Sequence, residues 1–292
     1  MADSLDQAAG LRRLFASRQL RAVTFASGSP GAGRTTLLAN VAVELARQGQ
    51  EVLVVDENGG RNLGAFFGTR PPGDLLQVLH RKRALEDILY SPFPGVRILA
   101  AGRAARQLTH LAVSEQQALM DGINTLSRPV DALLVDSSPD HAEGFSPLGL
   151  AGEAVMVVAG SRKSITDSYA LIRKISQSSV RRHFRILVNR VKNAEEGQVI
   201  FGNLKKVAAQ RGVARLEYGG AIPADDTLKR LGELCQPVVE ALPDNPASVA
   251  LRDFASRLYS WPEAEFGNGG VEQFVAQLLH FTSITTPHVL HA

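Results

Sequence analysis

Residues Arg21–Asp56 read RAVTFASGSPGAGRTTLLANVAVELARQGQEVLVVD, and they predict one complete repeating unit of the fold. The first six residues are typical of a β-strand, and they run into a loop rich in glycine, serine and proline. The pattern predicts a helix over Thr35–Gln48, which Gly49 closes. The apolar run Glu51–Asp56 then predicts a second strand that ends in an acid. Strand, glycine loop, helix and strand in this order form one βαβ unit, whose two strands are parallel.

The same alternation continues over most of the chain. Apolar strands are predicted at Val96–Ala100, Ala132–Asp136, Ala154–Ala159, Phe184–Val188 and, less strongly, Leu216–Ile222. Helices are predicted at Glu115–Leu126, Ile165–Ser176 and Glu195–Gln210. Apolar strands with helices between them indicate an α/β fold, a doubly wound and mostly parallel sheet flanked by helices. We expect this domain over residues 21–260, and only short helical pieces broken by prolines over 66–94.

Two amphipathic segments flank the predicted domain. Residues 3–17 predict a short helix, with Leu5, Ala8, Leu11, Leu14 and Phe15 at helical spacing. In VEQFVAQLLHF (271–281), one helical face carries Val271, Phe274, Val275, Leu278 and Leu279. We therefore assign residues 1–20 to an N-terminal amphipathic helix, and residues 261–292 to a C-terminal amphipathic helix with a flexible tail.

The composition limits the classes of function. The chain has 292 residues, 45% of them hydrophobic and 21% charged, which suits one large α/β domain with an appendage. A net charge of +3 and 6% aromatic residues argue against nucleic-acid binding through charge or stacking. One cysteine, Cys235, excludes an internal disulfide and a cysteine-based zinc site. With no signal peptide and no stretch of about 18 apolar residues, we expect a cytoplasmic protein.

The string GSPGAGRTT (Gly28–Thr36) has the features of a phosphate-binding loop, because it follows a strand and opens a helix. Its glycines let backbone N–H groups curl around phosphate oxygens. The following helix directs its positive end at them. Arg34 stands where lysine is usual; it keeps the charge but not the compact ammonium. The alternative is a glycine-rich turn without a ligand. We assign nucleotide binding to Gly28, Ser29, Gly31, Ala32, Gly33, Arg34, Thr35 and Thr36.

Two acids end predicted strands, Asp56 in EVLVVD and Asp136 in DALLVD. Acids at the carboxyl ends of parallel strands face the ligand crevice of a doubly wound sheet. Both could hold Mg²⁺ directly or through water, and the Thr35 hydroxyl could hold it as well. The sequence therefore predicts a magnesium site of Thr35, Asp56 and Asp136. The alternative is two ordinary strand-end residues.

These strings resemble the MinD/ParA group of deviant P-loop ATPases, from about Arg21 to Gly232. DENGGRNLGAFFG, which starts at Asp56, is similar to the group's switch I, and VDSSPD, which ends at Asp140, to its switch II. The resemblance implies ATP and Mg²⁺ as ligands and an ATP-dependent homodimer. It implies adenine-side contacts for Asn189 and Arg190, and catalytic roles for Asp56 and Asn58.

Two further strings resemble the flagellar number regulators of the FlhG/FleN kind: SITDSYALIRKI (Ser164–Ile175) and DQAAGLR (Asp6–Arg12). In that family the N-terminal element contacts and activates the GTPase FlhF, which implies partner binding by residues 1–20. The residues concerned are Asp6, Gln7, Ala8, Leu11 and Arg12. The family also implies a transcriptional activator as a partner, and peripheral contact with the inner face of the cell membrane through residues 271–281. Because that segment lacks Lys and Arg on its polar face, packing on the body of the protein or on a partner is the alternative.

Three positions depart from the family pattern. Ser29 stands for a second lysine that reaches the partner's nucleotide, Asn58 for an acid that orients the attacking water, and Gly64 for the acid that closes switch I. Since phosphoryl transfer depends on positioning and charge, losing the cation and the carboxylate would each cost on the order of 10²–10⁴ in rate. A weak ATPase and a non-hydrolysing scaffold both remain open.

The sequence thus predicts a nucleotide-switched regulator of flagellar number and placement that acts through partner proteins. Two alternatives stay open. One is the degenerate scaffold. The other is a MinD/ParA-type ATPase that positions another envelope machine or a DNA cargo, against which the modest net charge counts for DNA.

Overall fold

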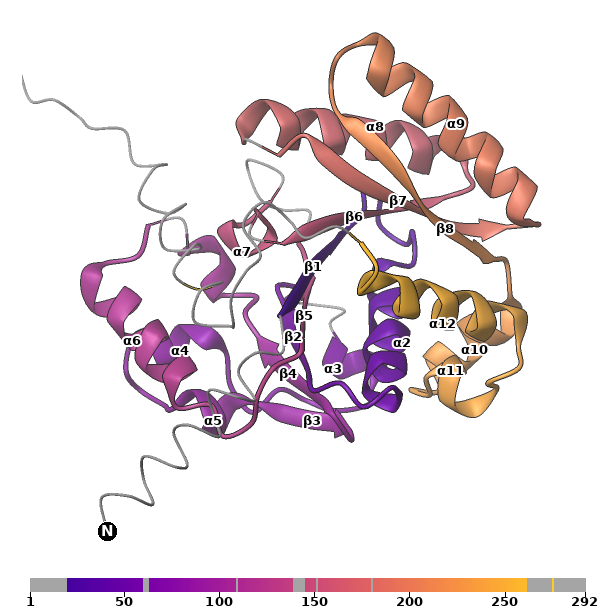
Figure 1. Ribbon diagram of the computed structural model, residues 1–292. Helices are drawn as coiled ribbons and strands as arrows, with labels where there is room; N and C mark the ends of the chain where they lie inside the picture. Colours follow the sequence, from indigo (N-terminus) through magenta and orange to yellow (C-terminus); the bar gives the residue numbers. More distant parts are fainter. Residues whose placement is uncertain are drawn as a thin grey trace, which may run out of the picture.

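The computed structural model describes residues 20–59, 63–108, 110–138, 145–150, 152–179, 181–261 and 275 (Figure 1). The N-terminal element DQAAGLR and all of segment 271–281 except Val275 lie outside these residues. The division of the chain at residues 20/21 and 260/261 therefore stays a prediction. No helix within the described ranges is both long and apolar enough to cross a bilayer.

Eight strands of the described chain form one sheet in the order β3-β4-β2-β5-β1-β6-β7-β8. Every neighbouring pair is parallel except β3 and β4. The strands are β1 (Arg21–Ala26), β2 (Val52–Asp56), β3 (Tyr90–Phe93), β4 (Val96–Ala100), β5 (Ala132–Asp136), β6 (Glu153–Ala159), β7 (His183–Val191) and β8 (Arg215–Pro223). The predicted mostly parallel sheet is confirmed, and so are all the predicted strands.

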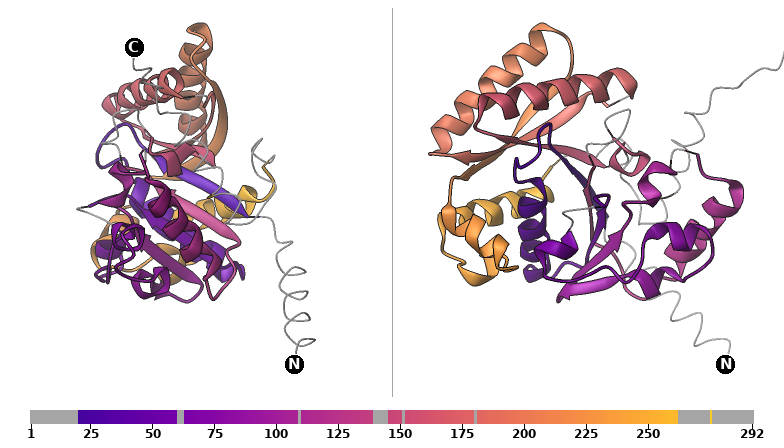
Figure 2. Two further views of the ribbon diagram at one scale, coloured as in Figure 1. Left: turned by 90° about the vertical axis from the view of Figure 1, so that its left-hand side faces the viewer. Right: turned by 180° about the vertical axis from the view of Figure 1, so that it is seen from behind.

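The helices cover both faces of this sheet, as Figures 1 and 2 show. They are α2 (Arg34–Arg47), α3 (Leu63–Phe66), α4 (Leu75–Leu79), α5 (Leu85–Ile88), α6 (Val113–Asn124), α7 (Pro147–Leu150), α8 (Arg162–Ser178), α9 (Ala194–Gln210), α10 (Asp226–Glu233), α11 (Val238–Ala241) and α12 (Pro246–Leu258), with a 3₁₀ turn at Ala104–Arg106. Helices α2, α6, α8 and α9 match the predicted ranges to within a few residues.

Alternation along the strands builds two apolar layers. Val52 and Val54 belong to the core beneath α2 and α12, while Leu53 and Val55 belong to the core beneath α4, α5 and α6. A third cluster fills the space between β6–β8 and the helices α8 and α9. Burial on both faces explains why the strands read as continuous apolar runs. The predicted doubly wound architecture is confirmed.

One strand was missed, because residues 66–94 were expected to hold only short helical pieces. Helices α4 and α5 do lie there, but Tyr90–Phe93 form β3, which pairs antiparallel with β4 at one edge of the sheet. The strand has four residues and contains Pro92. Proline has no N–H to donate, and an edge strand tolerates it because the outer side of the strand needs no hydrogen-bond partner. Neither its length nor its composition gives a strand signal.

The parallel register brings the ends of distant strands to one edge of the sheet. Asp56 at the end of β2 lies opposite Asp136 at the end of β5, and Asp136 lies opposite Phe25 in β1. Asn189 in β7 pairs in the same way with Ala159 at the end of β6. The loop Ser27–Gly33 leaves β1 at this edge and leads into α2. The predicted site residues therefore come from the strands β2, β5 and β7, from the loops after β1 and β2, and from the start of α2, which meet at one edge of the sheet.

Candidate functional site

The loop between β1 and α2 adopts a conformation that its glycines make possible. Gly31 and Gly33 have φ angles of +75° and +95°, in the left-handed region that side chains disfavour. Gly33 is the N-cap of α2 and supplies no side-chain acceptor to the first turn of the helix. The N–H groups at the start of a 14-residue helix therefore point into the loop, where the helix dipole favours an anion.

Gly28 packs directly against helix α8. A Cβ atom built on Gly28 would lie 2.3 Å from the carbonyl of Asp167 and 2.3 Å from the backbone nitrogen of Ser168. No side chain can occupy that space without moving the loop or the helix. The segment Ser164–Ile175 thus forms one wall behind the loop. Ser29 is buried, and its carbonyl accepts a hydrogen bond of 3.4 Å from the Ser27 hydroxyl.

The two strand-end acids lie together in the interior, joined by Asn58. The Asn58 amide nitrogen donates to Asp56 Oδ1 at 3.0 Å and to Asp136 Oδ2 at 3.0 Å. The backbone N–H of Leu63, at the start of α3, donates to Asp56 Oδ2 at 2.7 Å. One amide therefore bridges both carboxylates, and the second half of switch I is tied to the same acid.

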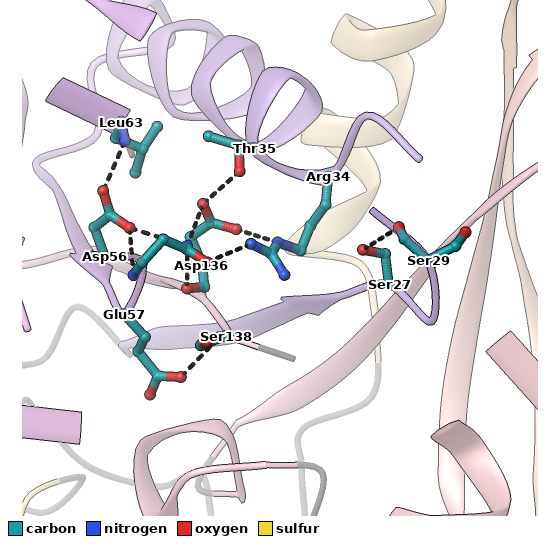
Figure 3. Close-up of polar contacts among 10 residues, drawn as sticks. Ser27, Ser29, Arg34, Thr35, Asp56, Glu57, Leu63, Asp136 and Ser138 are labelled. Carbon is teal, nitrogen blue, oxygen red and sulfur yellow. Dashed lines mark hydrogen bonds and ion pairs between the residues drawn. The ribbon is translucent and has the colours of Figure 1, made fainter. Parts of the chain in front are cut away.

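Arg34 and Thr35 contact Asp136 from the first turn of α2 (Figure 3). The Arg34 guanidinium donates through Nε to Asp136 Oδ1 and through Nη2 to Asn58 Oδ1 at 2.8 Å. The Thr35 hydroxyl donates to Asp136 Oδ2 at 2.7 Å. Both oxygens of Asp136 therefore accept hydrogen bonds from within the chain.

The electrostatics follow from burial. Burial raises the pKa of Asp56 to about 6, and the negative charge of Asp136 adds to the rise while hydrogen bonds from Asn58 and Leu63 oppose it. Burial also raises the pKa of Asp136, against the opposing effects of the Arg34 charge and the Thr35 hydroxyl. Two buried carboxylates that lie side by side need a cation near them to stay ionised.

A third buried carboxylate, Glu57, was not predicted. It is 2% exposed, accepts a hydrogen bond from the Ser146 hydroxyl, and accepts another of 3.1 Å from the backbone N–H of Ser138. Burial raises its pKa to about 7. Glu57 thus connects the end of β2 to the chain on both sides of residues 139–144. Its place between Asp56 and Asn58 is the one sequence signal that points to it.

Asn189 lies beside the loop. Its side-chain nitrogen donates to the carbonyl oxygen of Ala32 at 2.8 Å, and its side-chain oxygen accepts from the backbone N–H of Arg190 at 2.9 Å. Arg190 has a φ of +60° and an exposed side chain at the rim of the site. The adenine contact of both residues stays a prediction.

The fold gathers most of the predicted site residues at one edge of the sheet. These are Gly28, Ser29, Gly31, Ala32, Gly33, Arg34, Thr35, Thr36, Asp56, Asn58, Asp136 and Asn189, with Arg190 at the rim. The partner-binding residues Asp6, Gln7, Ala8, Leu11 and Arg12 lie outside the described residues.

The predicted magnesium ligands are oxygen atoms of the kind that Mg²⁺ prefers, but they already take part in hydrogen bonds within the chain. Hydroxyl and carboxylate oxygens are the ligands that Mg²⁺ prefers. Here, however, Thr35 donates to Asp136, and Asp56 and Asp136 accept from Asn58, Leu63 and Arg34. Among the described residues no group of three or more His, Cys, Asp or Glu side chains could hold a metal ion. In this arrangement the oxygens do not fit a divalent ion until the guanidinium moves.

Comparison with known proteins identifies the family. A sequence model of the CobQ/CobB/MinD/ParA nucleotide binding domain matches residues 23–238. The chain belongs to this family. Its relatives include the antiactivator FleN of Pseudomonas aeruginosa, 29% identical over 271 residues that cover 92% of this chain and 97% of FleN. Another is the flagellum site-determining protein YlxH of Helicobacter pylori, 27% identical over 267 residues that cover 89% of this chain and 90% of YlxH.

Solved structures of MinD share the family fold. The MinC:MinD cell division complex of Aquifex aeolicus has a chain that is 26% identical, with a TM-score of 0.63, and the match covers 84% of this chain and 98% of that one. MinD of Pyrococcus horikoshii, solved with Mg-ADP, is 22% identical with a TM-score of 0.59 over 82% of this chain and 96% of its own. The MinD/ParA family thus has a member with Mg-ADP bound, and its P-loop fold is the fold of this chain.

Proposed function

We propose that this protein is an ATP-binding, MinD-like regulator of flagellar number and placement that acts as a nucleotide-dependent switch. The observation that carries the proposal is the match to FleN over 92% of the chain. The match to YlxH, a second protein named for flagellum siting, points the same way. The same two relatives confirm the resemblance to the FlhG/FleN kind that the sequence predicted.

The loop geometry supports nucleotide binding. The left-handed glycines and the uncapped start of α2 present backbone N–H groups to an anion, which suits the phosphates of ATP. Thr35, Asp56 and Asp136 would hold Mg²⁺ once their present partners release them. Asn189 and Arg190 lie at the side of the loop where the adenine is expected.

The contacts around the acids suggest how a ligand would act as a switch. Asp56 accepts from Leu63 at the start of α3. Glu57 accepts from Ser138, inside the switch II string, and from Ser146, beyond that string. A ligand that changes the partners of Asp56 or Asp136 would therefore move both switch segments. It shifts the protein between states only to the extent that it binds one of them more tightly.

A second candidate function is a degenerate scaffold that binds nucleotide without hydrolysing it. The observation that favours it is the inward position of Arg34, whose guanidinium contacts Asp136 and Asn58. Ser29 adds to it, because the family's second loop lysine is absent. A positioning ATPase for another envelope or DNA cargo is a third candidate, and no contact described above favours it.

The proposed partners follow from the resemblance. We propose that an FlhF-like GTPase binds the N-terminal helix and contacts Asp6, Gln7, Ala8, Leu11 and Arg12. The name of the Pseudomonas relative, antiactivator, supports a transcriptional activator as a second partner. An ATP-dependent homodimer and peripheral contact with the inner face of the membrane through residues 271–281 complete the proposal, in an otherwise cytoplasmic protein.

Calorimetry and flagellar counts test the proposal together. Purified protein is titrated with ATP in the presence of Mg²⁺, and flagella are counted in cells that lack the gene. We expect measurable ATP binding and an abnormal number or placement of flagella. Normal flagella would point to another cargo, and an absence of ATP binding would remove the switch.

Removing residues 1–20 tests the partner assignment. The truncated protein is compared with the full chain for binding to the host's FlhF-like GTPase and for stimulation of its GTP hydrolysis. Both should fall at least about tenfold if the segment carries the main contact. ATP binding by the truncated protein serves as the control for folding. Unchanged stimulation would reject the assignment of DQAAGLR.

A further inference from the structure

Arg34 is the first residue of α2 and follows the glycine-rich loop directly. Its side chain is only 10% exposed, and its Nε donates to Asp136 (Figure 3). Its Nη2 donates to Asn58. The planar guanidinium is suited to bridging two acceptors in this way, whereas a lysine ammonium is a single point charge. The guanidinium therefore lies against the acids at the strand ends.

Asn58 completes this arrangement. Its oxygen accepts from Arg34, while its nitrogen donates to Asp56 Oδ1 and Asp136 Oδ2, each at 3.0 Å, and to the carbonyl oxygen of Asp136 at 3.1 Å. A carboxylate at this position could accept from Arg34 but could not donate to the two acids. It would also bring a third negative charge into a buried group. Arginine at 34 and the amide at 58 thus complement each other.

Arg34 and Asn58 stabilise the ionised carboxylates of Asp56 and Asp136, as a divalent ion beside them would. Asp56 and Asp136 are 1% and 0% exposed, and buried carboxylates need a cation and hydrogen bonds nearby. Among the described residues, Arg34 supplies the cation that pairs with Asp136. Together, Arg34, Asn58 and Thr35 contact the oxygens that a hard cation would bind.

We infer that the Arg34 guanidinium, held by Asn58, takes the place of the divalent cation at Asp56 and Asp136, so that Mg²⁺ and Arg34 compete for the same oxygens. The inference rests on the proposed nucleotide site and adds that a side chain of the protein itself supplies the cation there. Two consequences follow. The native protein binds free Mg²⁺ weakly, and its affinity for ATP depends only weakly on Mg²⁺.

Thermal unfolding without nucleotide tests the first consequence. Wild type and Arg34→Gln are melted in EDTA and in millimolar Mg²⁺ or Mn²⁺. We expect no metal response from wild type. Arg34→Gln should melt lower in EDTA, because two buried acids lose their cation, and metal should restore roughly 3 °C or more. The control is Arg81→Gln, which breaks an exposed Arg–Asp pair of 3.0 Å with Asp121 and should show neither effect.

Either of two results would overturn the inference: a metal response of wild type as large as that of Arg34→Gln, or no metal response in either protein. Should Arg34→Gln fail to fold, the double variant Arg34→Lys/Asn58→Asp replaces it. That variant keeps a cation in the loop and removes the bridging geometry, and Mn²⁺ binding is then read directly by electron paramagnetic resonance. Wild type should leave the Mn²⁺ signal free, and the double variant should quench it.

ATP titrations in EDTA and in Mg²⁺ test the second consequence. Wild-type affinities should agree within about threefold, and the double variant should bind at least about tenfold more tightly with Mg²⁺. A tenfold effect of Mg²⁺ on wild type would overturn the inference and leave the proposed function standing. If no protein binds ATP, the proposed function fails, and the metal-only experiments still decide whether Arg34 replaces the ion.

Discussion

The side-chain amide of Asn189, in β7, donates a hydrogen bond of 2.8 Å to the carbonyl oxygen of Ala32 in the phosphate loop. Asn189 is 2% exposed, and a Cβ atom built on Gly33 would lie 2.3 Å from its side-chain nitrogen. Since β6 separates β7 from β1, this bond ties the loop to a strand two positions away in the sheet. Asn189 therefore braces the loop from the side, in addition to any contact with a base.

Replacing Asn189 with alanine should loosen the loop. The buried carbonyl of Ala32 loses its side-chain donor, which costs roughly 1–3 kcal/mol of folding free energy. ATP affinity should fall about tenfold, because the loop is less ordered before it binds. Chemical denaturation and calorimetry measure the two effects. The matched control is Asn203→Ala on the exposed face of α9, and equal results for both variants would contradict the bracing role.

Gly28→Ala should disturb the loop through its contact with α8. The added methyl group would meet backbone atoms of Asp167 and Ser168 at 2.3 Å, and neither backbone can withdraw as a flexible side chain could. We expect a loss of at least about 2 kcal/mol in stability, comparable to overpacking a core, and a weaker response to ATP. Urea denaturation measures it. Gly202→Ala in α9 is the control: its Cβ meets open space, so it should stabilise the helix by about 0.5–1 kcal/mol.

The sequence predicted the sheet, and the gathering of the candidate site residues at one of its edges, better than the contacts among those residues. Asp56 and Asp136 could be placed together, because strand-end acids share one edge of a parallel sheet. The pairing of Arg34 with Asp136 joins residues 102 positions apart and depends on side-chain conformation, which no spacing encodes. Glu57 was missed because its partners Ser138 and Ser146 are near it only in the folded chain.

The helices after β8 were missed for a different reason. Helix α10 is short and polar, with Leu228 and Leu231 as its buried residues. Helix α12 buries Leu251 and Phe254 against α2 and β1. The ring centroids of Phe254 and Phe25 are 6.0 Å apart, in an edge-to-face contact. Such contacts come from tertiary packing, so the local pattern alone gives only a weak signal for these elements.

Glu217 should contribute stability that is lost in acid. Partial burial raises the pKa of this carboxylate, but the nearby His183, Arg185 and Arg215 outweigh burial and hold its pKa below the ordinary value. Arg185 Nη1 lies 2.6 Å from one oxygen and Arg215 Nη2 lies 2.8 Å from the other. Because the pKa is lowered on folding, the stabilisation is complete above about pH 5 and disappears as the pH falls through the folded-state value.

The measurement compares wild type with Glu217→Gln by urea denaturation at several pH values. Wild type should be more stable by about 1 kcal/mol at neutral pH, a modest figure because the side chain is 29% exposed. The difference should shrink below about pH 4. Glu233→Gln, at an exposed position in α10, is the control and should leave the pH profile of wild type unchanged. A difference that is constant down to pH 3 would rule out this role for the ion pairs.

A substitution at Val275 distinguishes the two predictions for the C-terminal segment, contact with the membrane and packing on the body of the protein. The residue is 4% exposed and belongs to the apolar cluster that includes Leu53 and Val135 beneath α4–α6. We therefore expect Val275→Ala to lower stability by about 1–3 kcal/mol in the absence of lipid. Val199→Ala, at a position in α9 that is 62% exposed, should have no such effect.

Vesicle binding separates the outcomes. If the apolar face of 271–281 is packed on the body, it cannot enter a lipid surface at the same time, and Val275→Ala should weaken packing and leave more of the segment free. Binding to anionic vesicles should then stay equal to wild type or increase. An unchanged melting temperature together with a loss of vesicle binding would mean that Val275 serves the membrane and not the core.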